Sequence, residues 1–136
     1  MTRRVLLVFH WAAGLSDAST GAMLMAAPAF TLGLMGLAAP ADAMPFVSFV
    51  GAFVLAVGLA YLYGARLVGR ECSMARLEAV WLVTAMVRSS VAVFVLAEVL
   101  KGALSPGWLT IAVFDAACVA FQALGLRNGW IRYAAQ

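Results

Sequence analysis

Long apolar runs separated by short polar segments dominate the chain. Three of them are easily delimited: residues 46–65 contain no charge, residues 79–100 contain Arg88 near their middle, and residues 108–126 contain Asp115. Each run is close to the 20 residues that a helix needs to cross about 30 Å of hydrocarbon. The pattern therefore predicts three transmembrane helices.

The first apolar run is longer and has to be divided. Residues 5–39, taken as one straight helix, would measure about 52 Å at 1.5 Å per residue. Pro28 lies within this run, and proline removes an intrahelical hydrogen bond and clashes with the preceding turn. We therefore expect a first span over about residues 5–27, a break at Pro28, and a short interfacial helix after it. The first 15 residues resemble a signal peptide, but we interpret them as the start of this span.

These elements predict an all-α integral membrane protein, with four transmembrane helices in a compact bundle and a single domain over residues 1–136. The composition agrees, because 65% hydrophobic and 11% charged residues is far more apolar than a typical soluble domain. Small residues four apart let membrane helices approach closely. We expect two such ladders to form helix contacts: Ala52, Ala56, Ala60 and Gly64 on the second span, and Ala112, Ala116 and Ala120 on the fourth.

The distribution of basic residues predicts the orientation. One side of the four-span arrangement carries seven arginines, and only Lys101 lies on the other side. By the positive-inside rule both termini face the cytoplasm, and the protein is expected in the cytoplasmic (inner) membrane. The basic residues are scattered, with no aromatic-interleaved stripe, so nucleic-acid binding is not expected. The seven arginines are Arg3, Arg4, Arg66, Arg70, Arg76, Arg127 and Arg132.

The two cysteines do not indicate a disulfide or a metal site. Cys72 falls in a short basic loop, whereas Cys118 lies in the middle of an apolar run. Their depths differ by about half a bilayer, and a disulfide needs Cα atoms within roughly 7 Å. No CxxC or cysteine–histidine cluster occurs, so no metal is predicted.

Three charged residues lie near the middle of predicted spans. Arg88 at the bilayer centre costs about 3 kcal/mol on insertion scales. Asp17, Arg88 and Asp115 each lie within about two residues of the middle of their spans, and so within about one helical turn of the same depth. Charges in lipid face the bundle interior and pair. We therefore expect Arg88 to lie between the two carboxylates in an Asp-Arg-Asp polar core.

Other polar and aromatic residues share faces with these charges. Trp81 and Thr84 align with Arg88 on the third span, and Cys118 and Gln122 follow Asp115 at i+3 and i+7 on the fourth. His10 and Thr20 lie near Asp17 in the helical register, and a membrane histidine can ligate haem or relay protons. A core histidine bonded to a backbone carbonyl or hydroxyl is the interpretation that we adopt. The candidate ligand or proton site comprises Asp17, Arg88, Asp115, His10, Thr20, Thr84 and Gln122, and an apolar pocket beside it would be lined by Trp11, Trp81, Phe94 and Cys118.

The order of these features resembles the small four-helix DoxX-like membrane proteins. The resemblance rests on a long first span ending at "AAP" (26–28), a short apolar segment, and a second span carrying "GAFVLAVGLAYL" (51–62), followed by a basic loop and two further spans. Neither Arg88 nor Asp17 matches a site of that family. Some members of that group accompany quinone-linked oxidoreductases and others are uncharacterised, so the resemblance implies the architecture more than a function.

Three classes of function follow from the polar core. In the first, it binds or passes a small ligand or a proton. In the second, the chain is an accessory subunit of a larger membrane assembly or a homo-oligomer, and the charges only fix helix order. In the third, it is an enzyme acting on a lipid-soluble substrate such as a quinone or isoprenoid, with Asp17 or Asp115 as an acid. Outside this third class no catalytic residue is assigned. No cofactor is predicted, and a quinone or another lipid-soluble molecule is the candidate ligand. The expected partners are the lipid bilayer and a homo-oligomer or larger membrane complex.

Overall fold

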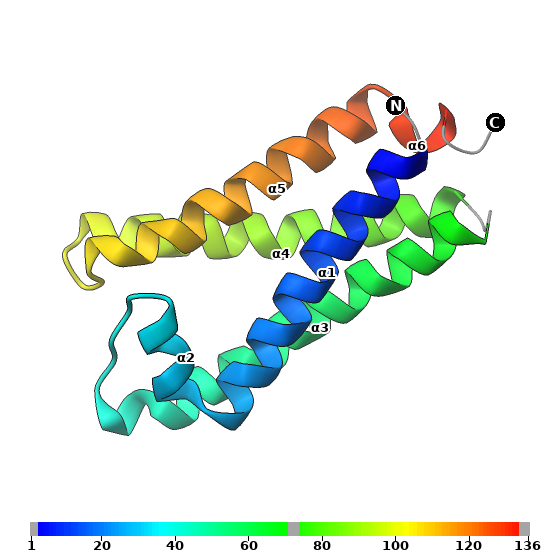
Figure 1. The fold of residues 1–136 in the computed structure, drawn as a ribbon. Coiled ribbons are helices and arrows are strands. Elements are labelled where there is room, and N and C mark those ends of the chain that lie inside the picture. The colour runs from blue at the N-terminus through cyan, green and yellow to red at the C-terminus, as the bar shows by residue number, and fades with distance from the viewer. Residues whose placement is uncertain (1–2, 71–73, 134–136) are drawn as a thin grey trace. The chain divides into compact units, whose positions relative to one another are not determined.

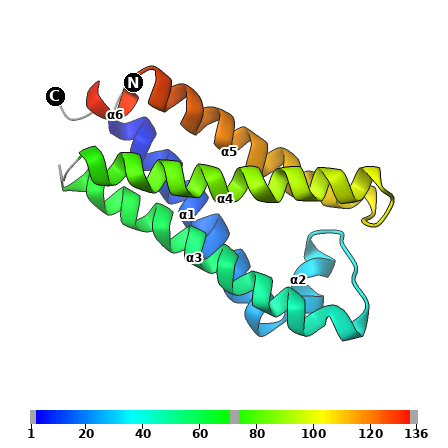
Figure 2. The same ribbon diagram turned by 180° about the vertical axis from the view of Figure 1, so that it is seen from behind.

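Helices make up almost the whole chain in the computed structural model, which describes residues 3–70 and 74–133 (Figures 1 and 2). Short 3-10 turns at Ala41–Ala43 and Pro106–Trp108 precede the third and fifth helices. No strand occurs among the described residues, so the all-α prediction is confirmed. The helices are α1 (Arg3–Ala26), α2 (Pro28–Leu34), α3 (Met44–Gly69), α4 (Met74–Leu100), α5 (Leu109–Arg127) and α6 (Trp130–Tyr133).

Three helical segments among the described residues are long and apolar enough to cross a membrane. They are Ala41–Gly69, Ala75–Leu100 and Pro106–Arg127, and they contain the spans predicted from the apolar runs. The chain is therefore a membrane-embedded helical protein. Helix α1 has 24 residues, or about 36 Å at 1.5 Å per residue, but its arginines, serines, Asp17 and His10 make it more polar than the other three.

The break in the first apolar run lies at Pro28, as predicted. Helix α1 ends at Ala26, the backbone of Ala27 leaves the helical region (φ −147°, ψ 67°), and Pro28 is the first residue of α2. Proline suits this position because the first helical N–H has no intrahelical acceptor. The Thr31 hydroxyl donates a 2.8 Å hydrogen bond to the carbonyl of Ala27. The chain turns back here, and α2 packs against α1 and α3 (Figure 1).

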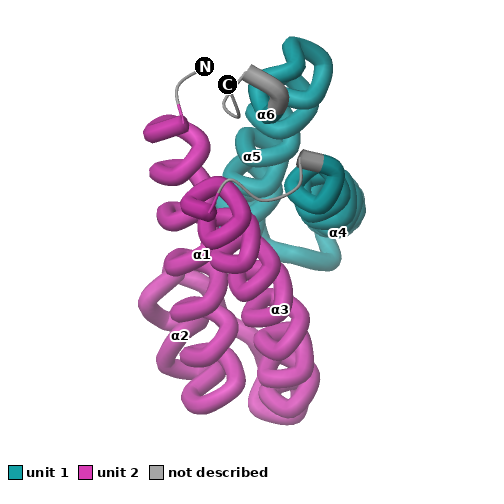
Figure 3. The backbone as a smooth tube through the Cα atoms, turned by 90° about the vertical axis from the view of Figure 1, so that its right-hand side faces the viewer, with its two compact units in different colours: residues 1–2, 71–136 teal, residues 3–70 magenta. Residues whose placement is uncertain are grey.

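The chain divides into two compact units, coloured separately in Figure 3. The N-terminal unit, residues 3–70, contains α1, α2 and α3. The C-terminal unit contains α4, α5 and α6. The four-helix bundle stays a prediction.

In the N-terminal unit, α1 and α3 run antiparallel and touch through their backbones. A Cβ placed on Gly58 would lie 2.8 Å from the Cα of Ala18, and one placed on Gly21 would lie 2.7 Å from the carbonyl oxygen of Gly51. Only glycine permits so close an approach without a shift of one backbone. The contact is made by two pairs of glycines, each seven residues apart: Gly14 and Gly21 on α1, and Gly51 and Gly58 on α3.

The predicted ladders of small residues are only partly buried within the units. Ala52 and Ala56 of α3 are exposed, as are Ala116 and Ala120 of α5. On α3 the packed face is set by glycines seven apart, and successive helical residues differ by about 100° in direction. The ladder beginning one residue after Gly51 therefore points away from α1. Gly64 of α3 and Ala112 of α5 are buried, so only part of each predicted ladder lies on a packed face of its unit.

In the C-terminal unit, α4 and α5 form an antiparallel hairpin around a buried tryptophan. Trp81 of α4 is fully buried, and its ring centroid lies 6.0 Å from that of Phe121 on α5. After α5, Gly129 adopts a positive φ of 65°, a conformation that residues with a Cβ rarely adopt. The turn brings Trp130 of α6 back to Phe121, with ring centroids 5.4 Å apart.

Candidate functional site

The facing sides of α4 and α5 carry polar residues at helical spacing. Both sets were predicted from the sequence, since residues three and four apart lie on one face. All are buried in the structure, which confirms the faces assigned to them. They are Trp81, Thr84 and Arg88 on α4, and Asp115, Cys118 and Gln122 on α5.

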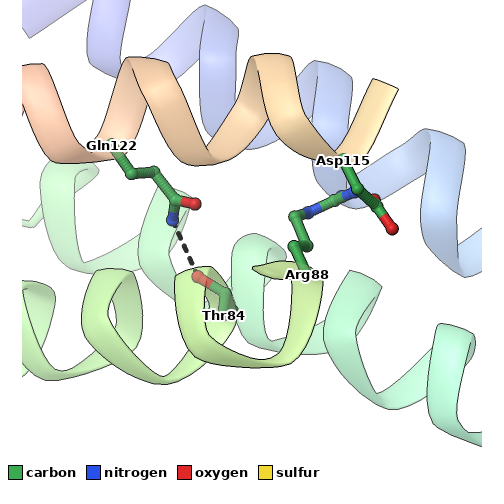
Figure 4. Close-up of polar contacts among 4 residues, drawn as sticks. All are labelled: Thr84, Arg88, Asp115 and Gln122. Carbon is green, nitrogen blue, oxygen red and sulfur yellow. Dashed lines mark hydrogen bonds and ion pairs between the residues drawn. The ribbon is translucent and has the colours of Figure 1, made fainter. Parts of the chain in front are cut away.

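Arg88 and Asp115 form an ion pair between the two helices. The Nη1 atom of Arg88 donates a hydrogen bond to Oδ1 of Asp115, and Figure 4 shows the two side chains meeting between α4 and α5. Their side chains are only 5% and 10% exposed. The predicted pairing of Arg88 with a carboxylate of the last span is therefore confirmed.

The same guanidinium group also contacts an aromatic ring. The Cζ atom of Arg88 lies 5.2 Å from the centroid of the Phe114 ring, within the range of a cation–π interaction, which contributes about 0.5–2 kcal/mol. Phe114 precedes Asp115, so one turn of α5 supplies both contacts. Sequence reasoning missed this residue, because a phenylalanine in an apolar run carries no distinctive signal.

A second polar contact joins the helices beside the ion pair. The Nε2 atom of Gln122 donates hydrogen bonds to Oγ1 of Thr84 at 2.8 Å and to the carbonyl oxygen of Trp81 at 3.3 Å (Figure 4). The Thr84 hydroxyl in turn donates to the carbonyl of Val80 at 2.7 Å. Thr84 therefore accepts from α5 and donates to its own helix.

These contacts form two polar layers in the hairpin. Thr84 and Arg88 are one turn apart on α4, about 6 Å along the axis, whereas Asp115 and Gln122 are about two turns apart on α5. Among the described residues, every buried side-chain nitrogen and oxygen has a hydrogen-bond partner. The arrangement supplies one cation, one carboxylate, one hydroxyl and one amide to a narrow region of two apolar helices.

The N-terminal unit has its own buried polar face on α1. The Nδ1 atom of His10 lies 2.8 Å from the carbonyl oxygen of Leu6, so Nδ1 is the donor and the lone pair of the neutral ring is on Nε2. The backbone partner expected for this histidine is confirmed. The His10 ring also lies edge-on to Tyr61 of α3, with centroids 6.0 Å apart.

The remaining members of the predicted site lie on different units or faces. Asp17 is buried on α1 and Thr20 is half-buried beside it. Since Asp17 belongs to the N-terminal unit and Arg88 to the C-terminal unit, their pairing stays a prediction. Trp11 is 50% exposed and Phe94 is 62% exposed, whereas Trp81 and Cys118 are buried, so a pocket lined by all four also stays a prediction.

Two buried residues of the packed faces were missed in the sequence. Tyr61 is fully buried and contacts the rings of Phe9 and His10. Gly125 packs against Trp81. Each continues a spacing already present, because Tyr61 follows Gly58 by three residues and Gly125 follows Gln122 by three. Extending the predicted face of the last span by one turn beyond Gln122 would have found Gly125, whereas the Gly58 face that leads to Tyr61 was not predicted.

Metal-ligating side chains do not gather in the described part of the chain. In residues 3–70 and 74–133, no group of three or more His, Cys, Asp or Glu side chains could hold a metal ion. Cys118 is buried in α5. Cys72 lies outside the described residues, so the prediction about a disulfide between these two cysteines stays a prediction.

Comparison of the chain with models of protein families, with characterised proteins and with solved structures finds no match. The resemblance to the DoxX-like proteins therefore stays a prediction.

Proposed function

We propose that this chain is an integral protein of the cytoplasmic membrane whose polar core binds or passes a small ligand or a proton. The observation that carries the proposal is the Arg88–Asp115 ion pair, buried halfway along two apolar helices and adjoining the Thr84–Gln122 contact. Four spans, with α1 as the first and both termini in the cytoplasm, complete the proposed topology.

The energetics of the ion pair support a functional use of these charges. Replacing a buried ion pair by well-packed apolar residues is often neutral or stabilising by 1–4 kcal/mol. Stability alone therefore does not require Arg88 and Asp115. A single polar contact is also enough to set the register of two helices, whereas this hairpin has two layers.

The carboxylate of Asp115 is the group proposed to exchange a proton. Protonation removes its charge and weakens the bond to Arg88. The Thr84 hydroxyl and the Gln122 amide supply further donors and acceptors along the hairpin, toward the end that carries Arg127. For a small anionic ligand, the planar guanidinium of Arg88 offers the matching donors.

Proton flux into liposomes tests this proposal. The purified protein is reconstituted with an entrapped pH-sensitive dye, and a pH gradient is imposed. We expect the wild type to collapse the gradient faster than protein-free liposomes, and Asp115→Asn to abolish the difference. Asp42→Asn, a matched change at an exposed residue outside the helices of the site, should behave as the wild type. Equal rates with wild type, Asp115→Asn and empty liposomes would exclude proton passage.

Thiol labelling tests the topology. Cysteines placed at the exposed residues Asp42 and Ser105 should react with an impermeant reagent added outside intact cells, and native Cys72 should react only after permeabilisation. Labelling in the opposite sense would overturn the orientation. If the cysteines at positions 42 and 105 label from opposite sides, the number of spans is wrong.

An accessory subunit of a larger membrane assembly is the second candidate. It is favoured by the complete hydrogen bonding of the buried side chains in the described residues, which a purely structural pair also requires. If the chain is an accessory subunit, the double variant Arg88→Met/Asp115→Leu should be as stable as the wild type and should still associate with the other subunits of the membrane assembly. Loss of proton flux or of small-anion binding in that stable variant would favour the first candidate.

A further inference from the structure

The start of α1 and the end of α3 lie together at one end of the N-terminal unit (Figures 1 and 2). Arg3 holds them there. Its Nε atom donates a 3.1 Å hydrogen bond to the carbonyl of Val68, and its Nη2 atom donates one of 2.7 Å to the carbonyl of Gly69. The last carbonyls of a helix have no intrahelical partner and carry partial negative charge. Arg3 therefore neutralises the end of α3.

Three further arginines surround this capped end. Arg66 lies in the last turn of α3, and Arg70 is the residue that follows its last helical residue, Gly69. The backbone N–H of Arg70 donates to the carbonyl of Arg66 at 3.1 Å, so Arg70 continues the face of Arg66. Arg4 follows the capping arginine on α1. All three side chains are exposed. We name Arg4, Arg66 and Arg70 the basic cluster.

The carboxylates described in this unit lie far from the basic cluster. Asp17 is 14 residues beyond Arg3, about 21 Å along α1, and Asp42 precedes the opposite end of α3, about 40 Å away. Glu71 follows Arg70 in the sequence and lies outside the described residues. By sequence, the four arginines and Glu71 give this end a net charge of +3. Arg70 makes a further contact of its own, so Arg4 and Arg66 are the cations on which the anion site depends.

The face of α3 below the arginines is apolar and exposed. Leu59 and Tyr63 precede Arg66 by seven and three residues, so all three lie on one side of α3, and Leu59 and Tyr63 are 54% and 46% exposed. On α1, Val8 lies one turn below Arg4 and is 67% exposed. Both helices therefore present a cation at the end and apolar side chains directly beneath it.

We propose that the basic cluster binds the headgroup of an anionic phospholipid, with the acyl chains along Val8, Leu59 and Tyr63. Guanidinium groups bind phosphate through two parallel hydrogen bonds, and basic sites beside membrane helices bind lipids with two phosphates, such as cardiolipin. The apolar side chains favour a lipid over free phosphate. This inference needs the membrane location but not proton passage or ligand binding at Arg88.

Thermal unfolding in detergent micelles tests the proposal. Purified protein is titrated with cardiolipin in phosphatidylcholine and followed by tryptophan fluorescence. We expect cardiolipin to raise the unfolding midpoint, and Arg4→Gln/Arg66→Gln to need about 30-fold more cardiolipin for half of that rise, because each arginine near an anionic surface contributes about fivefold. The matched double variant Arg76→Gln/Arg127→Gln removes two exposed arginines from the C-terminal unit and should respond as the wild type.

Two further titrations complete the test. The first distinguishes a phospholipid headgroup from free phosphate, and the second replaces the variant if it does not fold. Inorganic phosphate at the same concentration should leave the midpoint unchanged, and an equal rise would overturn the lipid assignment. If the Arg4/Arg66 variant does not fold, the wild type is titrated at about 0.1 M and about 1 M salt, where the Debye length falls from about 10 Å to about 3 Å. A cardiolipin response that is insensitive to salt, or equal losses in both double variants, would also overturn the proposal.

Discussion

Gly125 of α5 lies directly against the indole of Trp81 on α4: a Cβ placed on Gly125 would come within 2.8 Å of the Cη2 atom of that ring. The same Cβ would lie 2.8 Å from Cε3 of Trp130 on α6. The indole rings of Trp81 and Trp130 therefore both pack against the Cα hydrogen of Gly125 that a side chain would replace. The absence of a side chain at position 125 is what lets α4, α5 and α6 meet.

The variant Gly125→Ala should destabilise the protein by about 2 kcal/mol. The added methyl forces rigid rings apart, and such overpacking typically costs about 1–3 kcal/mol. Gly33→Ala is the matched control, because it is also helical but a Cβ there meets nothing within 4 Å. That change should be neutral or stabilising by up to about 1 kcal/mol. Thermal unfolding in detergent measures both, and equal stability of the two variants would contradict the packing.

The variant Arg88→Met should lower stability sharply, and adding Asp115→Asn should restore much of the loss. Removing one partner of a buried pair typically costs about 3–5 kcal/mol, because the other charge is left uncompensated. The double variant leaves neither charge. Thermal unfolding in detergent compares the three proteins. A harmless Arg88→Met would mean that the guanidinium is solvated, in contradiction to its burial.

A double-mutant cycle tests the predicted pairing of Asp17 with Arg88. If the two side chains pair, Asp17→Asn and Arg88→Met should be non-additive by about 0.5–3 kcal/mol, as residues in contact are. The cycle of Asp42→Asn with Arg88→Met is the control and should be additive. Additive effects in both cycles would show that Asp17 serves the N-terminal unit alone, and the three-residue core would reduce to Arg88 and Asp115.

The variant Gly58→Ala should separate α1 from α3 and cost about 3 kcal/mol. The added Cβ meets the backbone of Ala18 rather than a flexible side chain, so one helix must move. Ala56→Leu on the same helix is the control, because Ala56 is exposed, and it should change stability by less than about 0.5 kcal/mol. Thermal unfolding in detergent distinguishes the two. A larger loss with Ala56→Leu would restore the alanine ladder as a contact surface.

Features set by strong local chemistry were predictable from the sequence. Pro28 ends α1 because proline cannot continue the preceding hydrogen-bond pattern. Arg88 meets Asp115 because an isolated charge in hydrocarbon is costly and the two lie at similar depths. The polar faces of α4 and α5 followed from spacing of three and four residues, which needs no knowledge of the partner helix.

Features set by the partner helix were not predictable in the same way. Alanine and glycine both allow close packing, so the choice between Ala52 and Gly51 depended on where α1 lies. Tyr61 and Phe114 are ordinary aromatic residues until a histidine or a guanidinium is placed beside them. The membrane crossing of α1 stays open for a related reason, since its polar residues include Asp17, whose predicted pairing with Arg88 joins the two units.

The ion pair of the C-terminal hairpin has a consequence for biosynthesis. Arg88 and Asp115 are separated by 27 residues, and they sit on helices joined by one short turn. At about 5–20 residues per second of translation, Asp115 follows Arg88 out of the ribosome within roughly one to five seconds. Insertion of α4 and α5 as a pair would therefore bring Arg88 into lipid together with its counter-ion.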